Sequence, residues 1–199
     1  MAAADETPGS WLSQKLWQQR SYHLTRDHGV VLGAEVMIGT DALDLAVARQ
    51  RPLRWQRELA VHVGSDTRPE LVVRSRGRRW WAVTFDVLDR DGHLVGVMRR
   101  HWLRSWLRDR WTVAGADGRR LGELVEDSPG AALLRRLLSR WRLRQDYHLV
   151  DANGHRLAWS HDHGTLFARL DVQIPDACGV DPRLVLAAGL LLVVVEGRQ

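Results

Sequence analysis

Arginine and tryptophan alternate in three stretches of this chain, at residues 78–81, 99–111 and 129–141. A guanidinium group forks onto phosphate oxygens, and an indole ring prefers the boundary between lipid headgroups and acyl chains. Each basic residue close to an anionic membrane contributes about 1 kcal/mol of binding free energy. The pattern therefore predicts a lipid-binding surface, whose candidate residues are Arg78, Arg79, Arg99, Arg100, Trp102, Arg104, Trp106, Arg108, Arg135, Arg136, Arg140 and Trp141.

The same stretches have two other interpretations. In the first, tryptophans such as Trp80 and Trp141 fill the core while the arginines cover a solvated face. In the second, arginine with aromatic residues binds nucleic acid, but the chain has no zinc knuckle, RNP-type sequence or helix-turn-helix pattern. Nucleic acid is therefore not an expected partner. The choice between a lipid-binding surface and tryptophans that fill the core depends on whether the three clusters face outward together.

Three aspartates, Asp171, Asp176 and Asp181, recur five residues apart near the C-terminus. Carboxylates are the ligands that calcium prefers, so these residues are the candidate metal ligands. An EF-hand loop, however, alternates its acidic ligands and ends on a glutamate at the twelfth position, which this spacing does not do. The competing interpretation is a helix cap preceded by loop acids. Calcium is the one cofactor that the sequence suggests.

Residues that could catalyse a reaction are sparse. His161 and His163 lie on one side of a predicted strand, yet a metal centre there needs further ligands from elsewhere. Cys178 stands in a predicted loop without an evident base to activate it. The chain has no Gly-x-Ser-x-Gly, Walker or His-Glu-x-x-His motif. We therefore expect that the protein is not an enzyme.

Composition favours an anionic partner inside the cell. The 199 residues carry a net charge of +5, and Lys15 is the only lysine, so arginine supplies almost all the positive charge. A GC-rich genome would produce the same bias. Cys178 is the only cysteine, so the fold does not depend on an intrachain disulfide. The first residues lack the order of a signal peptide. We expect a cytoplasmic protein, peripheral at the inner face of the plasma membrane.

A repeated β-hairpin is the strongest signal of organisation. Four segments share an apolar run, a polar turn with glycine and a second short apolar run, at residues 25–33, 88–96, 113–122 and 149–158. Three of the turns carry Asp-Gly or Asn-Gly, which accept the positive φ angles of a type I′ turn. Further strands are predicted at 58–63, 71–74, 80–87 and 166–172. Because repeated hairpins leave unpaired edges unless the sheet closes, the sequence predicts a closed antiparallel barrel.

Two helices interrupt this β pattern. Ser128 and Pro129 form a helix start, and the leucines that follow fall on one face with arginines outside it, which predicts a short inserted basic amphipathic helix over 129–141. At the C-terminus, residues 184–195 contain no polar side chain and follow Asp181 and Pro182, another helix start. Twelve residues reach about 18 Å, whereas a bilayer core needs ~20 residues. This helix is therefore expected to be enclosed by protein.

The hairpins, the glycine turns and the Asp-Pro-led apolar segment together resemble the phospholipid scramblase-related and LURP-one-related family. The resemblance runs from Tyr22 to Glu196 and rests on pattern rather than on one motif. It implies the tubby-like fold, in which about twelve antiparallel strands close around a central hydrophobic C-terminal helix. The expected domains are a flexible leader at 1–20 and this barrel at 21–199.

The resemblance also implies a function. It points to a non-enzymatic protein that binds anionic phospholipid at the membrane surface, and to phospholipid scrambling, although a barrel filled by 184–195 offers a headgroup no path. The cysteine cluster and proline-rich arm of animal scramblases are missing from this sequence. The alternative function is a protein-interaction or small-ligand-binding module with no lipid role.

Overall fold

The structure is a computed structural model, and it describes residues 8–27, 35–52, 57–79, 82–101, 110–126, 145–151, 153, 155–163, 167–176 and 178–195. Within these ranges the chain forms twelve strands and two helices. In chain order they are α1 (Pro8–Gln18), β1 (Ser21–Asp27), β2 (Glu35–Thr40), β3 (Leu43–Pro52), β4 (Arg57–Val63), β5 (Leu71–Arg79), β6 (Ala82–Asp89), β7 (Leu94–His101), β8 (Arg110–Gly115), β9 (Arg120–Glu126), β10 (Gln145–Asp151), β11 (Arg156–His163), β12 (Phe167–Gln173) and α3 (Pro182–Val195).

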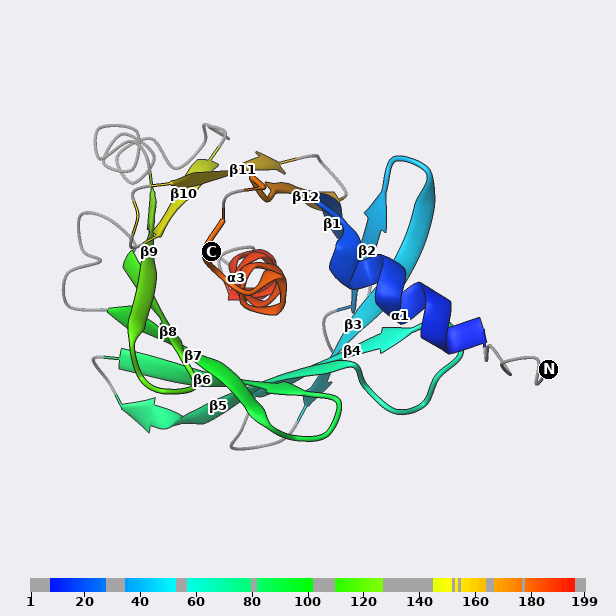
Figure 1. Cartoon of the computed structure of the whole chain (residues 1–199), viewed down its shortest axis with the longest axis horizontal. Coiled ribbons are helices and arrows are strands. Elements are labelled where there is room, and N and C mark those ends of the chain that lie inside the picture. The colour runs from blue at the N-terminus through cyan, green and yellow to red at the C-terminus, as the bar shows by residue number, and fades with distance from the viewer. Residues whose placement is uncertain are drawn as a thin grey trace.

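The strands form one antiparallel sheet in which sequence neighbours pair (Figure 1). β1 pairs with β2 on one side and with β12 on the other, so the sheet runs round as a closed barrel. The prediction of a mainly β fold with one antiparallel sheet and a C-terminal helix is confirmed. β4 and β5 cover the strands predicted at 58–63 and 71–74, and β6 and β12 cover the described parts of those predicted at 80–87 and 166–172. The predicted inserted helix at 129–141 lies outside the described residues.

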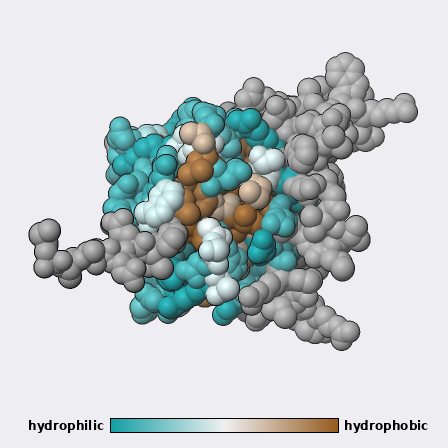
Figure 2. Space-filling view, turned by 90° about the vertical axis from the view of Figure 1, so that its right-hand side faces the viewer, coloured by the Kyte–Doolittle hydropathy of each residue, from teal (hydrophilic) through white to brown (hydrophobic). Residues whose placement is uncertain are grey.

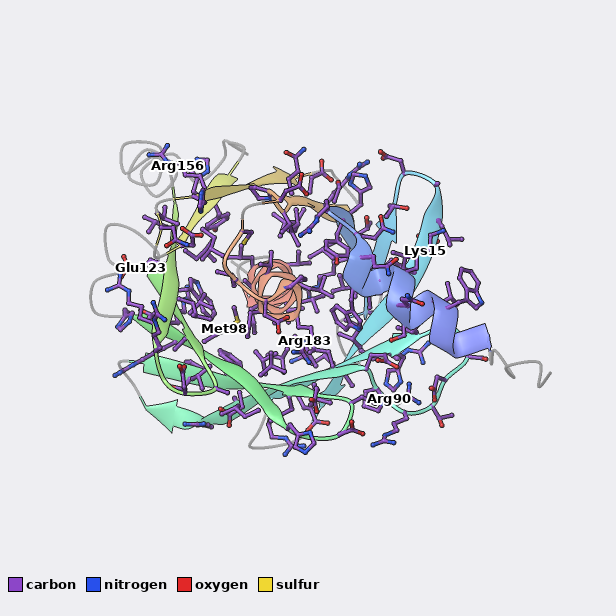
Figure 3. The ribbon with its side chains drawn as sticks, viewed as in Figure 1. Lys15, Arg90, Met98, Glu123, Arg156 and Arg183 are labelled. Atoms are coloured by element: carbon purple, nitrogen blue, oxygen red, sulfur yellow. The ribbon has the colours of Figure 1, made fainter. Side chains whose placement is uncertain are left out.

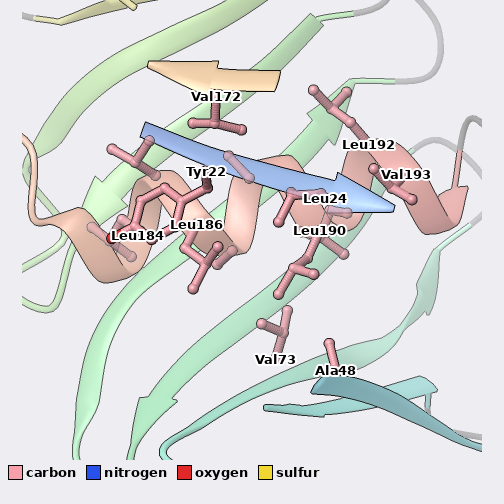
Figure 4. Close-up of a cluster of buried hydrophobic side chains, with 14 of the residues drawn as sticks. Tyr22, Leu24, Ala48, Val73, Val172, Leu184, Leu186, Leu190, Leu192 and Val193 are labelled. Carbon is pink, nitrogen blue, oxygen red and sulfur yellow. The ribbon is translucent and has the colours of Figure 1, made fainter. Parts of the chain in front are cut away.

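The apolar C-terminal helix α3 lies inside the ring of strands (Figure 1). Its side chains from Leu184 to Val194 are buried on every side, as expected for a helical segment without a polar face. They pack against inward-facing residues such as Leu24 of β1, Val172 of β12 and Val73 of β5 (Figure 4). Its 14 residues are about 21 Å long. In the described part of the chain no helix is long and apolar enough to cross a membrane.

Both ends of α3 are held by polar contacts. At the start, the Asp181 carboxylate accepts a hydrogen bond from the Arg183 backbone N–H at 2.9 Å, as an N-cap residue does. Near the end, Nη1 of the buried Arg26 donates to the Val193 carbonyl at 3.4 Å. A cation at that position is favourable, because the last carbonyls of a helix carry partial negative charge.

The hairpin turns differ from the type I′ turns that the sequence suggested. A type I′ turn needs positive φ at both central residues, but in the described residues only glycines have positive φ, among them Gly92 and Gly118. The Gly92 N–H donates to the Asp89 carbonyl at 3.0 Å, and the Asp89 N–H donates to the His93 carbonyl at 2.9 Å. These bonds define a three-residue loop with glycine in the left-handed position. The prediction of type I′ turns was wrong, because Asp-Gly fits both geometries.

The expected flexible leader is also corrected where it is described. Residues 8–18 form α1, which packs beside β3 and β4 (Figure 1). Leu16 is completely buried in the core, and the hydroxyl of Tyr22 donates to the Leu16 carbonyl at 2.6 Å. Burial raises the pKa of Tyr22, with the nearby charge of Arg20 opposing the rise. Figure 2 views this side of the molecule, where hydrophobic residues form a band flanked by hydrophilic ones.

Candidate functional site

The strands that flank the arginine- and tryptophan-rich stretches of the sequence end or begin at one end of the barrel. Because each strand reverses direction, odd-numbered strands finish, and even-numbered strands begin, at the same end. The sequence segments between these strand ends are residues 28–34, 53–56, 80–81, 102–109, 127–144 and 164–166, which lie outside the described residues. Together they contain eight arginines, two acidic residues and six of the ten tryptophans. We call this the arginine end.

The other end of the barrel has the opposite charge balance. Its five strand connections are 41–42, 64–70, 90–93, 116–119 and 152–155, and the links to the helices are 19–20 and 174–181. These segments contain seven acidic residues and four arginines. We call this the acidic end. α3 runs from the acidic end, where Leu184 lies beside Gly96 at the start of β7, to the arginine end, where Arg26 reaches Val193.

The candidate lipid-binding residues fall into two groups. The backbones of Arg78, Arg79, Arg99 and Arg100 are described, where β5 and β7 approach the arginine end. The others lie outside the described residues, namely Trp102, Arg104, Trp106, Arg108, Arg135, Arg136, Arg140 and Trp141.

Of the four residues whose backbones are described, only Arg99 and Arg100 also have described side chains, and the environments of these two differ. Arg99 is exposed. The guanidinium of Arg100 instead lies 5.6 Å from the ring centre of Trp111, a tryptophan that is only 2% exposed. A cation over an indole face is attracted by the ring quadrupole. Trp111 therefore belongs to the core, while Arg99 is available to an external partner. The tryptophans that the core interpretation named lie outside the described residues, namely Trp80, Trp102, Trp106 and Trp141.

Each of the three candidate calcium ligands forms an ion pair with a different basic side chain. The Asp171 carboxylate is 2.6 Å from Nδ1 of His23 and 2.9 Å from Nε of Arg169. Asp176 is 3.4 Å from Nε of Arg20, and Asp181 is 2.7 Å from Nη2 of Arg183. Within the described residues no group of three or more histidine, cysteine, aspartate and glutamate side chains is placed to hold a metal ion. The structure does not bring the three aspartates together.

A cleft of about 590 Å³ opens at the acidic end, beside the start of α3. Arg90, labelled in Figure 3, lines the cleft. One of its guanidinium nitrogens contacts the buried Glu70, and the other is 2.7 Å from Asp66. Arg183 borders the cleft from α3 and lies 3.9 Å from Asp89. The remaining lining residues are Trp17, Asp91, Asp181 and Pro182. The Arg90 ion pairs join the 64–70 and 90–93 connections, and the Arg183–Asp89 pair joins the end of β6 to the helix start.

Two aspartates at the acidic end have a role that sequence reasoning missed. Asp89 and Asp151 each end a strand, and Oδ1 of each accepts backbone hydrogen bonds of 2.8–3.0 Å from the residues two and four positions later. Oδ2 of Asp151 also accepts the Gly179 N–H at 3.4 Å, which holds the segment leading to α3. The repeated pattern Asp-x-Asp/Asn-Gly-His was the available signal.

The hydrogen bonds to these carboxylates change their pKa values. Burial alone raises the pKa of Asp151, but the bonds from His155, Asn153 and Gly179 lower it overall. Burial likewise opposes ionisation of Asp89, and the backbone N–H groups of His93 and Asp91 outweigh it. Both carboxylates are therefore stabilised in the ionised form, which keeps them as acceptors at neutral pH.

Cys178, the one cysteine, lies half-buried in the same lead-in segment. Burial raises the pKa of its thiol, and the thiol donates to the Val180 carbonyl at 3.8 Å. Because the thiolate is the nucleophile, a raised pKa lowers the reactivity of this side chain at neutral pH. Its environment is that of a structural cysteine.

No model of a known protein family matches the chain, and no curated protein sequence matches it significantly. Its function has to be inferred from its residues and from the way in which the fold places them.

Proposed function

We propose that this chain is a non-enzymatic, scramblase-related protein with a tubby-like barrel, which binds anionic phospholipid at a membrane surface through its arginine end. The observation that carries the proposal is the segregation of charge between the sequence segments that connect strand ends at the two ends of the barrel. The six segments that follow odd-numbered strands contain eight arginines and two acidic residues, whereas the segments that belong to the other end contain seven acidic residues and four arginines. The segregation supports an approach to the membrane with the arginine end first.

The chemistry of the arginine end suits lipid phosphate. Each guanidinium presents a planar fork of donors to phosphate oxygens. Six tryptophans in the same connections add rings that favour the headgroup boundary. At about 1 kcal/mol for each basic residue near the membrane, eight arginines give several kcal/mol of binding free energy. Salt weakens this attraction by screening the charges.

The filled interior of the barrel argues against phospholipid scrambling, the second function that the family resemblance implies. α3 occupies the barrel with apolar side chains, most of them at most 2% exposed. A hydrated headgroup moving through it would lose its water without gaining polar contacts. We therefore propose binding without scrambling, at the cytoplasmic face of the plasma membrane, where anionic lipids give a surface potential of about −30 mV.

Vesicle flotation with the full chain tests the proposal. Vesicles of phosphatidylcholine containing phosphatidylserine are compared with vesicles of phosphatidylcholine alone, at low and high salt. The proposal expects flotation with the anionic vesicles that falls as salt rises. Equal flotation with both kinds of vesicle, or none with either, contradicts it.

A further inference from the structure

A second cleft, of about 320 Å³, opens at the acidic end, where β1 and β11 begin and β12 ends. Ligand pockets in proteins measure about 300–1,000 Å³, so this one has room for a small molecule. We call it the β1–β11 groove. Two of its described lining residues are arginines and none is acidic, although it lies at the end of the barrel with the surplus of acids. The lining residues are Arg20, Ser21, Arg156, Gln173, Ile174 and Pro175.

Strand pairing fixes the two arginines on either side of β12. The Ile174 N–H donates to the Arg20 carbonyl at 2.8 Å, and Ser21 at the start of β1 pairs with Gln173 at the end of β12. β11 pairs with the other edge of β12, and its first residue, Arg156, is labelled in Figure 3. Ile174 is buried in the core, so the segment between the arginines is anchored.

The groove contains hydrogen-bond donors that the protein leaves unused. Ser21, Arg156 and Gln173 are exposed, and their side chains form no hydrogen bond or ion pair within the described part of the chain. Arg20 is 3.4 Å from Asp176, which is longer than the about 2.7–2.9 Å of a charge-assisted hydrogen bond. Asp176 is 96% exposed, so it is free to move aside for another anion. Two guanidinium groups, a hydroxyl and an amide therefore remain for a ligand.

A carboxylate further along β12 has its charge already engaged. Asp171, two residues before Gln173, is 2.9 Å from Nε of Arg169 and 2.6 Å from Nδ1 of His23. Its oxygens therefore do not compete for the arginines of the groove.

We propose that the β1–β11 groove binds the phosphate group of a small soluble phosphate monoester. A guanidinium forks onto two phosphate oxygens, and a phosphate monoester carries about 1.5–2 negative charges at neutral pH, which two arginines balance. Its terminal oxygens also accept from the Ser21 hydroxyl and the Gln173 amide, whereas a carboxylate has only two oxygens to share among these donors.

Phosphate binding in the groove does not depend on the proposed lipid binding, because the groove residues belong to none of the segments of the arginine end. The expectation of a soluble ligand does rest on that function. A membrane bound through the arginine end leaves the acidic end, and with it the groove, facing the solution.

NMR titration of the full chain with glycerol 3-phosphate, at constant ionic strength and without lipid, tests the site. We expect saturable shifts of the Arg20 and Arg156 Nε–H signals, and weaker binding of acetate. Arg20→Gln with Arg156→Gln should weaken binding at least about tenfold, since one exposed charge contact is worth up to about fivefold. The control, Arg68→Gln with Arg119→Gln, loses the same charge at the same end and should bind like the original chain. Shifts that are absent or do not saturate, equal losses in the two variants, or equally tight binding of acetate would overturn the proposal.

A third variant tests the competition by Asp176. Asp176→Asn removes the carboxylate that faces Arg20, so the phosphate monoester should bind at least about twofold more tightly. Unchanged or weaker binding would contradict a groove in which Asp176 and the ligand share one arginine.

Flotation with phosphatidylcholine vesicles that contain phosphatidic acid separates a soluble from a lipid phosphate. The Arg20→Gln with Arg156→Gln variant should float like the Arg68→Gln with Arg119→Gln control. Reduced flotation of the first variant alone would assign the groove to a lipid headgroup and overturn a soluble ligand. If the original chain does not float, that result counts against the proposed lipid binding, and the titration still decides whether the groove binds phosphate.

Discussion

Leu24 of β1 lies so close to Gly189 of α3 that a Cβ atom added to the glycine would stand 2.7 Å from the Leu24 Cδ1 atom. The same atom would stand 3.1 Å from Cγ2 of Val172 on β12. β1 and β12 are the strands whose pairing joins the two ends of the sheet. At Gly189, α3 therefore packs tightly against β1 and β12, the strand pair that closes the barrel.

Enlarging Gly189 should unfold or strongly destabilise the protein. Gly189→Leu places four carbon atoms where the first already meets two side chains, and overpacking of this kind costs about 1–3 kcal/mol or more. We expect a loss of at least ~3 kcal/mol in the free energy of unfolding, measured by urea denaturation. Gly189→Ala is the matched control, because the Leu24 methyl can turn aside and alanine favours helix by ~1 kcal/mol. A Gly189→Leu variant as stable as the original chain would show that α3 is not enclosed.

Removing one carboxylate oxygen from Asp151 should loosen the lead-in to α3. Asp151→Asn puts an amide donor in place of the oxygen that accepts the Gly179 N–H. Two donors then face each other in a buried place, which costs about 1–3 kcal/mol. Urea denaturation measures the loss, and Asp117→Asn in an exposed turn is the control, with an expected change within about 0.5 kcal/mol. Equal effects in both variants would contradict this role for Asp151.

Acid should destabilise the fold through the same groups. The pKa values of Asp89 and Asp151 are lower in the folded protein than the ordinary value of 3.8, so the unfolded chain binds protons more readily. Their contribution is present above the pKa of an unfolded aspartate, about 3.9, and is lost as pH falls through the lower folded pKa values. Thermal unfolding between pH 7 and pH 2 should show a fall that begins near pH 4 and is shallower in Asp151→Asn. The same slope in both proteins would exclude Asp151 as a cause.

The hydroxyl of Tyr22 should hold α1 in place. Tyr22→Phe removes a buried 2.6 Å hydrogen bond to the Leu16 carbonyl, at a cost of about 1 kcal/mol. Hydrogen exchange of the α1 amides should become faster, while exchange in α3 changes only by the smaller global loss. Lys15→Ala, on the exposed side of α1, is the control. Unchanged α1 exchange in Tyr22→Phe would show that packing of Leu16 alone fixes the helix.

The sequence was sufficient to predict the elements whose signals are local. Asp181 and Pro182 mark the start of α3 because capping depends on neighbouring residues, and the glycine turns mark the hairpins for the same reason. The barrel order follows from hairpins in succession, because each strand pairs with the next one. The prediction of the turn type failed, since Asp-Gly also fits a three-residue loop.

Contacts between residues that are distant in the sequence could not be predicted from the sequence alone. Arg90 meets Asp66 across 24 positions, and Arg26 reaches Val193 across 167, and neither pairing leaves a spacing pattern. Residues 11–17 offer too short an apolar pattern to predict that Leu16 enters the core. That the arginine-rich stretches are flanked by strand ends at the same end of the barrel could be recognised only from the strand order, because these stretches are far apart in the sequence.

The most direct measurement of the central claim compares two variants that lose the same charge from opposite ends. One carries Arg135→Ser, Arg136→Ser and Arg140→Ser at the arginine end, and the other carries Arg20→Ser, Arg68→Ser and Arg119→Ser at the acidic end. Both are titrated with phosphatidylserine-containing vesicles at low salt, and the bound fraction is measured by flotation. With about 1 kcal/mol for each basic residue near the surface, the first variant should lose at least tenfold in affinity while the second binds like the original chain. Equal losses in the two variants, or a greater loss in the second, would contradict binding through the arginine end.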